Sequence, residues 1–246
     1  MSDITEVTGI VLSAMPVGEF DRRIVILTKE RGKIAAFAKG ARRPNSPLTG
    51  ITRPFVFGTF QVYEGRTSYT IRQANITAYF EEIISDFDAV CYAYYFAELA
   101  DYYGRENLDA ADMINLLYVA FKALVNKSLP NELVRYIYEI RLIAVNGECP
   151  DFFSCAGCGS EKELQLYSYK ENGMYCVECA ASSGDGIVLQ SSTLYTLQYI
   201  ITAPLTKLFN FVVKADVLNE LKKVVNRIEF ITFDKHFKSK EMLDIG

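Results

Sequence analysis

The chain has 246 residues, of which half are hydrophobic and 13% aromatic, so it can build a packed core and is too apolar for long disorder. No stretch reaches the roughly 18 uncharged apolar residues that a membrane-spanning helix needs. The first residues lack the basic start and apolar run of a signal peptide, so we expect a cytoplasmic protein without a membrane partner. Six cysteines in such a chain suggest thiols or metal ligands before disulfides.

The net charge of −4 is unevenly distributed along the chain. Residues 1–80 carry eleven Lys and Arg against six Asp and Glu, which leaves +5 there and −9 in the remainder. A basic front on an acidic body is typical of a protein in which one domain meets a polyanion. The alternative is that small domains vary by a few charges by chance.

Residues 1–80 alternate in the way that short strands do, and the pattern predicts strands at 5–14, 23–29, 33–38, 55–63 and 68–73. The connection 39–53 contains two Pro and two Gly, so we expect a loop or a short irregular helix there. Five short strands with one long connection favour an OB-type Greek-key barrel over residues 1–80. We expect Phe55, Phe57 and Tyr63 to be barrel core rather than base-stacking surface.

From residue 81 the apolar residues recur at helical spacing. We expect helices that begin near residue 81, near residue 109 and at Pro130, and two more over 190–202 and 213–230. Asp86 and Asp88 are better explained as helix-capping residues than as magnesium ligands. The predicted fold class is therefore α+β, with the barrel at 1–80 and a helical domain at 81–246 that carries an insertion at about 150–183. Tyrosines at 92, 94, 95, 102 and 103 are expected to be core or domain interface.

The insertion contains two C-x2-C units, Cys155–Cys158 and Cys176–Cys179, separated by seventeen residues. That spacing is typical of zinc ribbons, with a hairpin over 164–175 between the two knuckles. Four thiolates close a tetrahedral site and leave no position for substrate, so we expect one structural zinc ion on Cys155, Cys158, Cys176 and Cys179. An iron–sulfur cluster and a redox dithiol pair remain as alternatives. Cys91 and Cys149 are expected to be buried thiols.

No catalytic constellation is recognisable. The single histidine is His236, and neither a phosphate loop nor a Gly-x-Gly-x-x-Gly motif occurs. We therefore expect a binding protein rather than an enzyme. Two other classes stay open, a metal-dependent nuclease built from distant carboxylates and a zinc-ribbon interaction module of transcription or translation.

Several runs in the chain occur in a fixed order. They are Gly18-Glu19, Leu27–Lys33, Ala38–Arg43 and Pro54-Phe55, then Tyr138–Leu142 and Gly147–Pro150 before the first knuckle, and His236–Lys240 near the end. In this order they resemble the RecO family of bacterial DNA repair proteins over nearly the whole chain. The chain departs from the family pattern at Thr52-Arg53, where the family usually has Leu-Gln, and in a shortened C-terminal motif.

The resemblance implies a recombination mediator in the bacterial cytoplasm, associated with the nucleoid. Such proteins bind single- and double-stranded DNA, anneal complementary strands, work with RecR, contact the acidic tail of single-strand-binding protein and help to load RecA. For DNA contacts we nominate basic residues of the barrel and its connection, each of which has solvated surface charge as the alternative: Arg31, Lys33, Lys39, Arg42, Arg43 and Arg53. For the acidic tail the candidates are Arg135, Arg141, Lys235, Lys238 and Lys240.

Overall fold

A computed structural model describes residues 4–66, 68–182 and 185–244 of the chain. Contacts divide the chain into two compact units, Met1–Lys127 with Phe237–Gly246, and Ser128–His236. The domain boundary that we expect after residue 80 stays a prediction. No helix in the described part of the chain is both long and apolar enough to cross a membrane.

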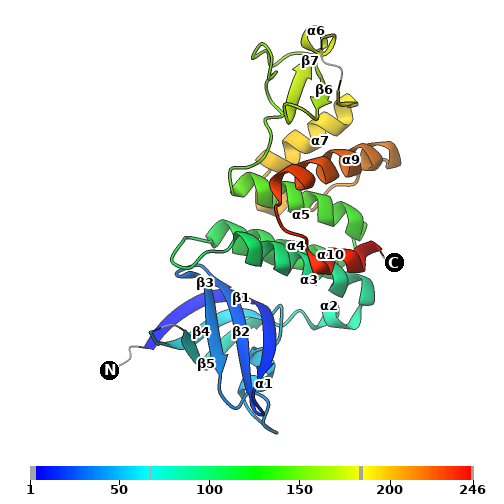
Figure 1. Ribbon diagram of the computed structural model, residues 1–246. Helices are drawn as coiled ribbons and strands as arrows, with labels where there is room; N and C mark the ends of the chain where they lie inside the picture. The colour runs from blue at the N-terminus through cyan, green and yellow to red at the C-terminus, as the bar shows by residue number, and fades with distance from the viewer. Residues whose placement is uncertain (1–3, 67, 183–184, 245–246) are drawn as a thin grey trace. The chain divides into compact units, whose positions relative to one another are not determined.

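The first unit begins with a closed five-stranded barrel (Figure 1). Its strands are β1 (Ile4–Val17), β2 (Asp21–Thr28), β3 (Gly32–Ala38), β4 (Phe57–Glu64) and β5 (Tyr69–Ala78), joined in the order β1-β2-β3-β5-β4. All pairs are antiparallel except β3–β5, in which Ala36 lies opposite Tyr69. The predicted strands and the OB-type barrel are confirmed.

The long strand β1 closes the barrel because its two halves pair with different neighbours. Ile4–Ile10 pairs with β4, whereas Gly9–Val17 pairs with β2 across a register shift between Val11 and Ser13. A bulge of this kind bends a strand and lets a sheet curl upon itself. At the crossing a side chain on Gly9 would meet the Leu27 carbonyl oxygen at 2.2 Å, so glycine is required there.

The barrel interior is filled by apolar side chains that alternate along each strand. In β3 every second residue is buried, which places Ile34, Ala36 and Ala38 inside. The other strands add aliphatic and aromatic side chains, among them Val7, Val11, Ile24, Ile26, Phe60, Val62 and Ile71. Complete burial of such side chains stabilises a fold by about 1.5–3 kcal/mol each.

Besides the one-turn helix α1 (Leu48–Ile51) between β3 and β4, the described helices of the first unit are α2 (Glu81–Ser85), α3 (Phe87–Tyr103), α4 (Ala111–Asn126), α10 (Lys238–Glu241) and the 3-10 turn η1 (Met242–Asp244). The single helix expected from residue 81 is broken at Asp86. The Asp86 backbone is extended there, and its carboxylate accepts hydrogen bonds from the amides of Asp88 and Ala89. Asp86 is thus a helix cap, as predicted, and its cap is what separates α2 from α3.

Aromatic residues join the barrel to these helices. Phe55 is completely buried, but its ring packs edge-on against Tyr94 and Phe121 rather than inside the barrel, and Phe57 packs on Tyr118. The prediction that both rings are barrel core is therefore corrected: they lie between the barrel and its helices. Of the tyrosine stripe, Tyr95 is completely buried as expected, whereas Tyr94 is 41% exposed although its ring packs on Phe55.

The second unit packs three helices together, α5 (Asn131–Val145), α7 (Ser191–Thr202) and α9 (Ala215–Thr232), with the short α8 (Leu205–Leu208). Pro130 precedes α5 and Gly147, with φ of +77°, follows its end, as predicted. Between α5 and α7 lies a small sheet in the order β7 (Gly173–Cys176), β6 (Leu164–Ser168), β8 (Ile187–Val188). The short helix α6 (Val177–Ala180) follows β7 and was not expected from the sequence.

Candidate nucleic-acid interface and metal centre

The connection 39–53 lies against the turn between β1 and β2. The Gly40 amide donates to Asp21 Oδ1 at 2.7 Å, and the Arg42 amide donates to the Phe20 carbonyl at 2.8 Å. The Arg42 guanidinium also donates to the Gly18 carbonyl at 3.2 Å. The connection includes the one-turn helix α1 (Leu48–Ile51), as the sequence suggested. These bonds hold the connection and the turn together at one end of the barrel.

Arg22 binds the C-terminal half of the connection. Its Nη1 atom donates to the Thr49 carbonyl at 2.9 Å and to Thr52 Oγ1 at 3.0 Å. Burial lowers the pKa of Arg22, and the nearby charges of Arg53 and Arg42 lower it further. The part of this lowering that comes from Arg53 and Arg42 is like-charge repulsion, which an anion bound nearby would offset.

We call Arg22, Lys39, Arg42, Arg43 and Arg53 the cationic patch. Arg22 is half-buried and the other four are exposed. Across the described residues none of the five lies within 4.0 Å of a carboxylate, although seven ion pairs form elsewhere. The adjoining turn carries two acids, Glu19 and Asp21, of which Asp21 accepts the Gly40 amide. The patch therefore keeps a net positive charge facing solvent.

The two remaining nominees lie at the opposite end of the β2–β3 hairpin, near its Thr28–Gly32 turn. Arg31 pairs with Glu64 at 3.3 Å, and Lys33 pairs with Asp101 at 3.2 Å and donates to the Asp101 carbonyl. The structure thus gathers four of the six nominated residues and leaves two apart, each beside a carboxylate. DNA contact by Lys39, Arg42, Arg43 and Arg53 stays a prediction, and Arg31 and Lys33, whose charges are already paired, are not carried into the proposal below.

Arg22 was missing from the residues nominated on sequence, although a signal for it exists. In the β2–β3 hairpin Arg22 lies opposite Ala38, the last residue before the connection. A register count from the Glu30–Gly32 turn would have placed Arg22 beside Lys39. Once that register is known, Arg22 and Lys39 are seen to lie at the same end of the hairpin.

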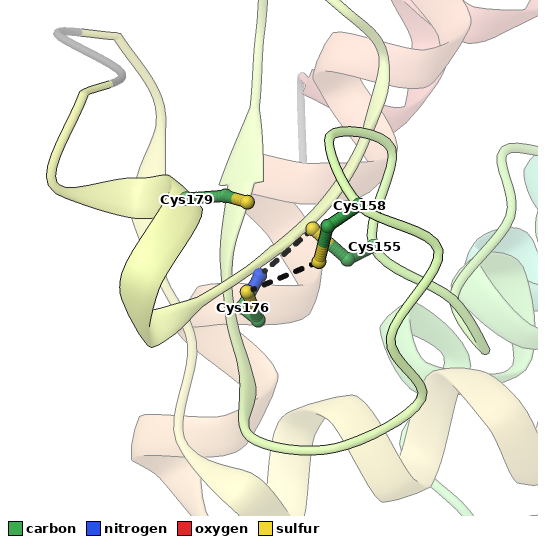
Figure 2. A group of neighbouring side chains, drawn as sticks. All are labelled: Cys155, Cys158, Cys176 and Cys179. Atoms are coloured by element: carbon green, nitrogen blue, oxygen red, sulfur yellow. Dashed lines mark hydrogen bonds between the residues drawn. The ribbon is translucent and has the colours of Figure 1, made fainter.

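The four cysteines of the insertion converge on one point (Figure 2). Cys155 and Cys158 come from the loop before β6, Cys176 ends β7 and Cys179 lies on α6. Their four sulfur atoms lie within 4.8 Å of one another, and Cys158 Sγ is 3.7 Å from Cys176 Sγ. Bonds of about 2.3 Å in a tetrahedral zinc site place sulfurs about 3.8 Å apart, so the cluster fits such an ion.

Backbone features shape the first knuckle. The Gly159 amide donates to the Cys155 carbonyl at 2.8 Å, and Gly159 has φ of +75°, which favours glycine. A side chain on Gly157 would stand 3.0 Å from both Cys179 Sγ and a ring carbon of Tyr175. Glycine is therefore favoured at 159 by its backbone conformation and at 157 by the tight space beside Cys179.

The cysteines also differ in burial and in thiol pKa. Burial opposes ionisation of Cys155, yet backbone amides led by that of Cys176 lower its pKa to about 6. Outside the cluster Cys91 is buried, as predicted, and Cys149 is half-buried with a pKa raised to about 12 by burial. The cluster could thus hold a metal, whereas burial keeps Cys91 and Cys149 as protonated thiols.

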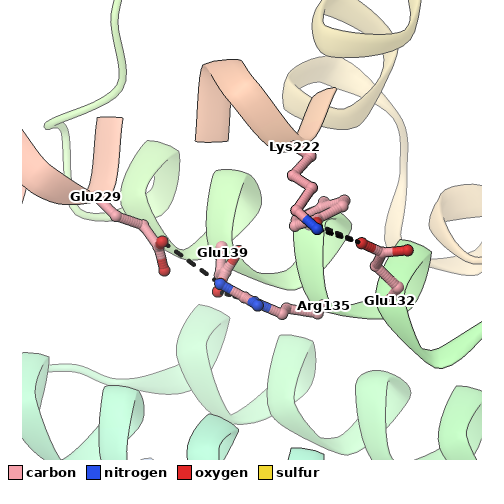
Figure 3. Close-up of polar contacts among 6 residues, drawn as sticks. Glu132, Arg135, Glu139, Lys222 and Glu229 are labelled. Atoms are coloured by element: carbon pink, nitrogen blue, oxygen red, sulfur yellow. Dashed lines mark hydrogen bonds and ion pairs between the residues drawn. The ribbon is translucent and has the colours of Figure 1, made fainter. Parts of the chain in front are cut away.

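A buried ion cluster removes one candidate for the acidic tail (Figure 3). Arg135 Nε donates to Glu139 Oε1 at 2.7 Å, and Arg135 Nη2 lies 3.5 Å from Glu229 Oε2, which ties α5 to α9. Arg135 is 8% exposed, so its charge is already used within the unit. Arg141 donates to the Ile200 carbonyl. Arg135 is therefore withdrawn as a tail contact.

Comparison with known proteins places the chain in a family. The family described as recombination protein O N terminal matches residues 1–80, and recombination protein O C terminal matches residues 84–241. A DNA repair protein RecO from Acetivibrio thermocellus is 31% identical over 96% of this chain and 94% of its own length. The RecO of Bacillus subtilis is 28% identical, and that of Clostridium acetobutylicum 27%, over 98% and 96% of this chain and 94% and 96% of their own lengths. The barrel, the helical part, the cysteine cluster and these matches together show that the chain belongs to the RecO family of DNA repair and recombination proteins.

Proposed function

We propose that this protein binds single- and double-stranded DNA without reading sequence, anneals complementary strands and assists recombinase loading. The observation that carries the proposal is the cationic patch, five cations without a carboxylate partner among the described residues, on the barrel of a RecO-family chain. Lysine and arginine at such a surface neutralise phosphates and release counterions, which supplies affinity independent of sequence. Two strands whose phosphates are neutralised repel each other less and pair faster.

The partners follow from family membership. We propose RecR, the acidic C-terminal tail of single-strand-binding protein and, through these, RecA. Arg141, Lys235, Lys238 and Lys240 remain as candidates for the acidic tail. The location proposed is the bacterial cytoplasm at the nucleoid.

The cysteine cluster is proposed to hold one structural zinc ion. Four thiolates are the donor set that zinc prefers, and the sulfur spacing fits it. Bound there, zinc supplies cross-linking of the two knuckles and no chemistry on a substrate. The ribbon would then fold only with its metal.

Strand annealing tests the proposal. Two complementary oligonucleotides, one labelled with a donor dye and one with an acceptor, are mixed with the protein, both naked and coated with single-strand-binding protein. We expect the protein to speed pairing in both cases, and Arg42→Ala with Arg43→Ala to slow it. Arg31→Ala, which removes a cation already paired with Glu64, is the control. Equal rates with and without the protein contradict the proposal.

Annealing of coated strands distinguishes recognition of single-strand-binding protein from simple binding of DNA. Deletion of the terminal Phe from the single-strand-binding protein should abolish annealing of coated strands while naked strands still pair. An identical response of both reactions would make this protein a simple polyanion binder. Turnover of labelled DNA with magnesium would instead favour the nuclease.

A further inference from the structure

Phe20 is an exposed aromatic residue that contacts Arg42 and Arg43 of the cationic patch. It ends the turn between β1 and β2, and its side chain is 38% exposed. The same hairpin exposes Met15 and Val17, at 56% and 38%. The hairpin therefore presents an aromatic ring to solvent in direct contact with a cation of the patch.

The backbone of Phe20 is held in place from two sides. Its carbonyl accepts the Arg42 amide at 2.8 Å, and the next residue, Asp21, accepts the Gly40 amide at 2.7 Å. Two residues earlier, Gly18 has φ of +55° and its carbonyl accepts the Arg42 guanidinium. The ring is thus presented on a fixed turn and does not need to be ordered when a ligand binds.

The guanidinium of Arg43 lies over the Phe20 ring, with Cζ 5.2 Å from the ring centroid. That distance is within the range of a cation–π contact. Arg43 follows Arg42, whose guanidinium reaches the turn, and Arg22 lies beneath the same connection with Arg53 beside it. One flat aromatic surface therefore stands among several groups that bind phosphate.

Nucleobases stack on aromatic rings and on guanidinium planes, and every base offers such a face. Bases in a duplex are already stacked on their neighbours, whereas those of a single strand are free to turn outward. A stacking surface beside phosphate-binding cations therefore distinguishes single strands from duplexes, which cations alone do not.

We propose that Phe20 and Arg43 form a stacking platform for one unpaired base of single-stranded DNA. The phosphates on either side of that base are neutralised by the five cations of the cationic patch. The platform deepens the DNA-binding function proposed above and rests on it. It adds a preference for single strands to a patch that otherwise binds any polyanion.

The absence of tryptophan from the chain makes a direct test possible. Phe20→Trp introduces a single tryptophan into the platform, whose indole can be excited at wavelengths that the 16 tyrosines do not absorb, and stacking on a base quenches indole emission. Phe87→Trp is the matched control, because Phe87 is 73% exposed at the start of α3, outside the cationic patch. A dye-labelled oligo-dT monitors binding by anisotropy in the same titration.

We expect saturating oligo-dT to quench Phe20→Trp and to leave Phe87→Trp unchanged. Phe20→Ala should weaken binding of oligo-dT by about 5- to 150-fold, the range for loss of one base–aromatic stack. Affinity for a duplex of equal length should change by less than about two-fold. Phe20→Leu, which keeps the apolar bulk without the ring, should behave like Phe20→Ala.

Other results separate the two proposals. Binding of oligo-dT that leaves the emission of Phe20→Trp unchanged would overturn the platform and keep the DNA-binding function. Equal weakening of single strands and duplexes by Phe20→Ala would overturn it as well. If the unmodified protein binds neither oligonucleotide at low salt, the DNA-binding function fails and the platform fails with it.

Discussion

Replacement of Arg42 and Arg43 by alanine should change how DNA binding responds to salt. Each phosphate contact on a single strand contributes about 0.7 to the slope of log affinity against log salt. If all five cations of the cationic patch contact phosphates, the slope is about −3.5, and the double variant retains about −2.1. Between 50 and 200 mM salt the unmodified protein then loses affinity by about 130-fold and the variant by about 20-fold.

Fluorescence anisotropy of labelled oligo-dT at several salt concentrations measures both slopes. The matched control is Arg31→Ala with Lys127→Ala, which removes the same charge from the first unit. Both of these cations already pair with a carboxylate, at Glu64 and Asp86. We expect the control slope to equal that of the unmodified protein. A control that flattens as much as the double variant would mean that net charge, rather than the patch, determines binding, and an unchanged slope in the double variant would refute the reasoning.

Three further predictions concern stability and metal. Purified protein should carry one zinc per chain by metal analysis, Cys155→Ser should lose it and melt at lower temperature, and Cys91→Ser should keep it; a metal-free chain with an intact ribbon would contradict this. Arg135→Met should cost about 3–5 kcal/mol in urea unfolding, because it leaves a buried carboxylate without its cation; a cost below about 1 kcal/mol would speak against the ion cluster. Burial and then the charge of Glu229 raise the pKa of Glu139, so the unfolding free energy should fall as pH rises through that raised pKa. Glu139→Gln should flatten this fall, and an unchanged pH profile in the variant would contradict the reasoning.

Much of the fold follows from local patterns in the sequence. Alternation of buried and exposed residues marks each barrel strand, as Ile34, Ala36 and Ala38 show in β3. The two C-x2-C units predict the cysteine cluster because their spacing belongs to one geometry. Where a pattern repeats within a few residues, the local sequence alone is enough to predict the structure.

The rest depends on contacts between distant segments. Phe55 alternates like a barrel residue, yet its ring lies against Tyr94 and Phe121, which no local pattern reveals. The break at Asp86 was hidden because apolar periodicity continues through it. Arginine is usually a surface residue, and the burial of Arg135 depends in part on Glu229, a partner ninety-four residues away that no local pattern reveals.

The candidate DNA-binding site was likewise predictable from the sequence only in part. The sequence indicates that the connection 39–53 is basic, but the pairing of Arg31 with Glu64 joins residues 33 positions apart and was not predictable from spacing. The register of the β2–β3 hairpin brings Arg22 to the connection, and the turn between β1 and β2 brings Phe20 there. Charge composition indicates which part of the chain carries excess positive charge, and only the fold shows which of those cations lie together without a carboxylate partner.

Amide hydrogen exchange with and without saturating oligo-dT tests the central claim most directly, because it locates the contact on the chain. The cationic patch predicts slower exchange in residues 18–22 and 39–53, with no change at the Thr28–Gly32 turn of the β2–β3 hairpin. Unchanged exchange in 18–22 and 39–53, with protection confined to helices of the second unit, would contradict the claim that the barrel end binds DNA.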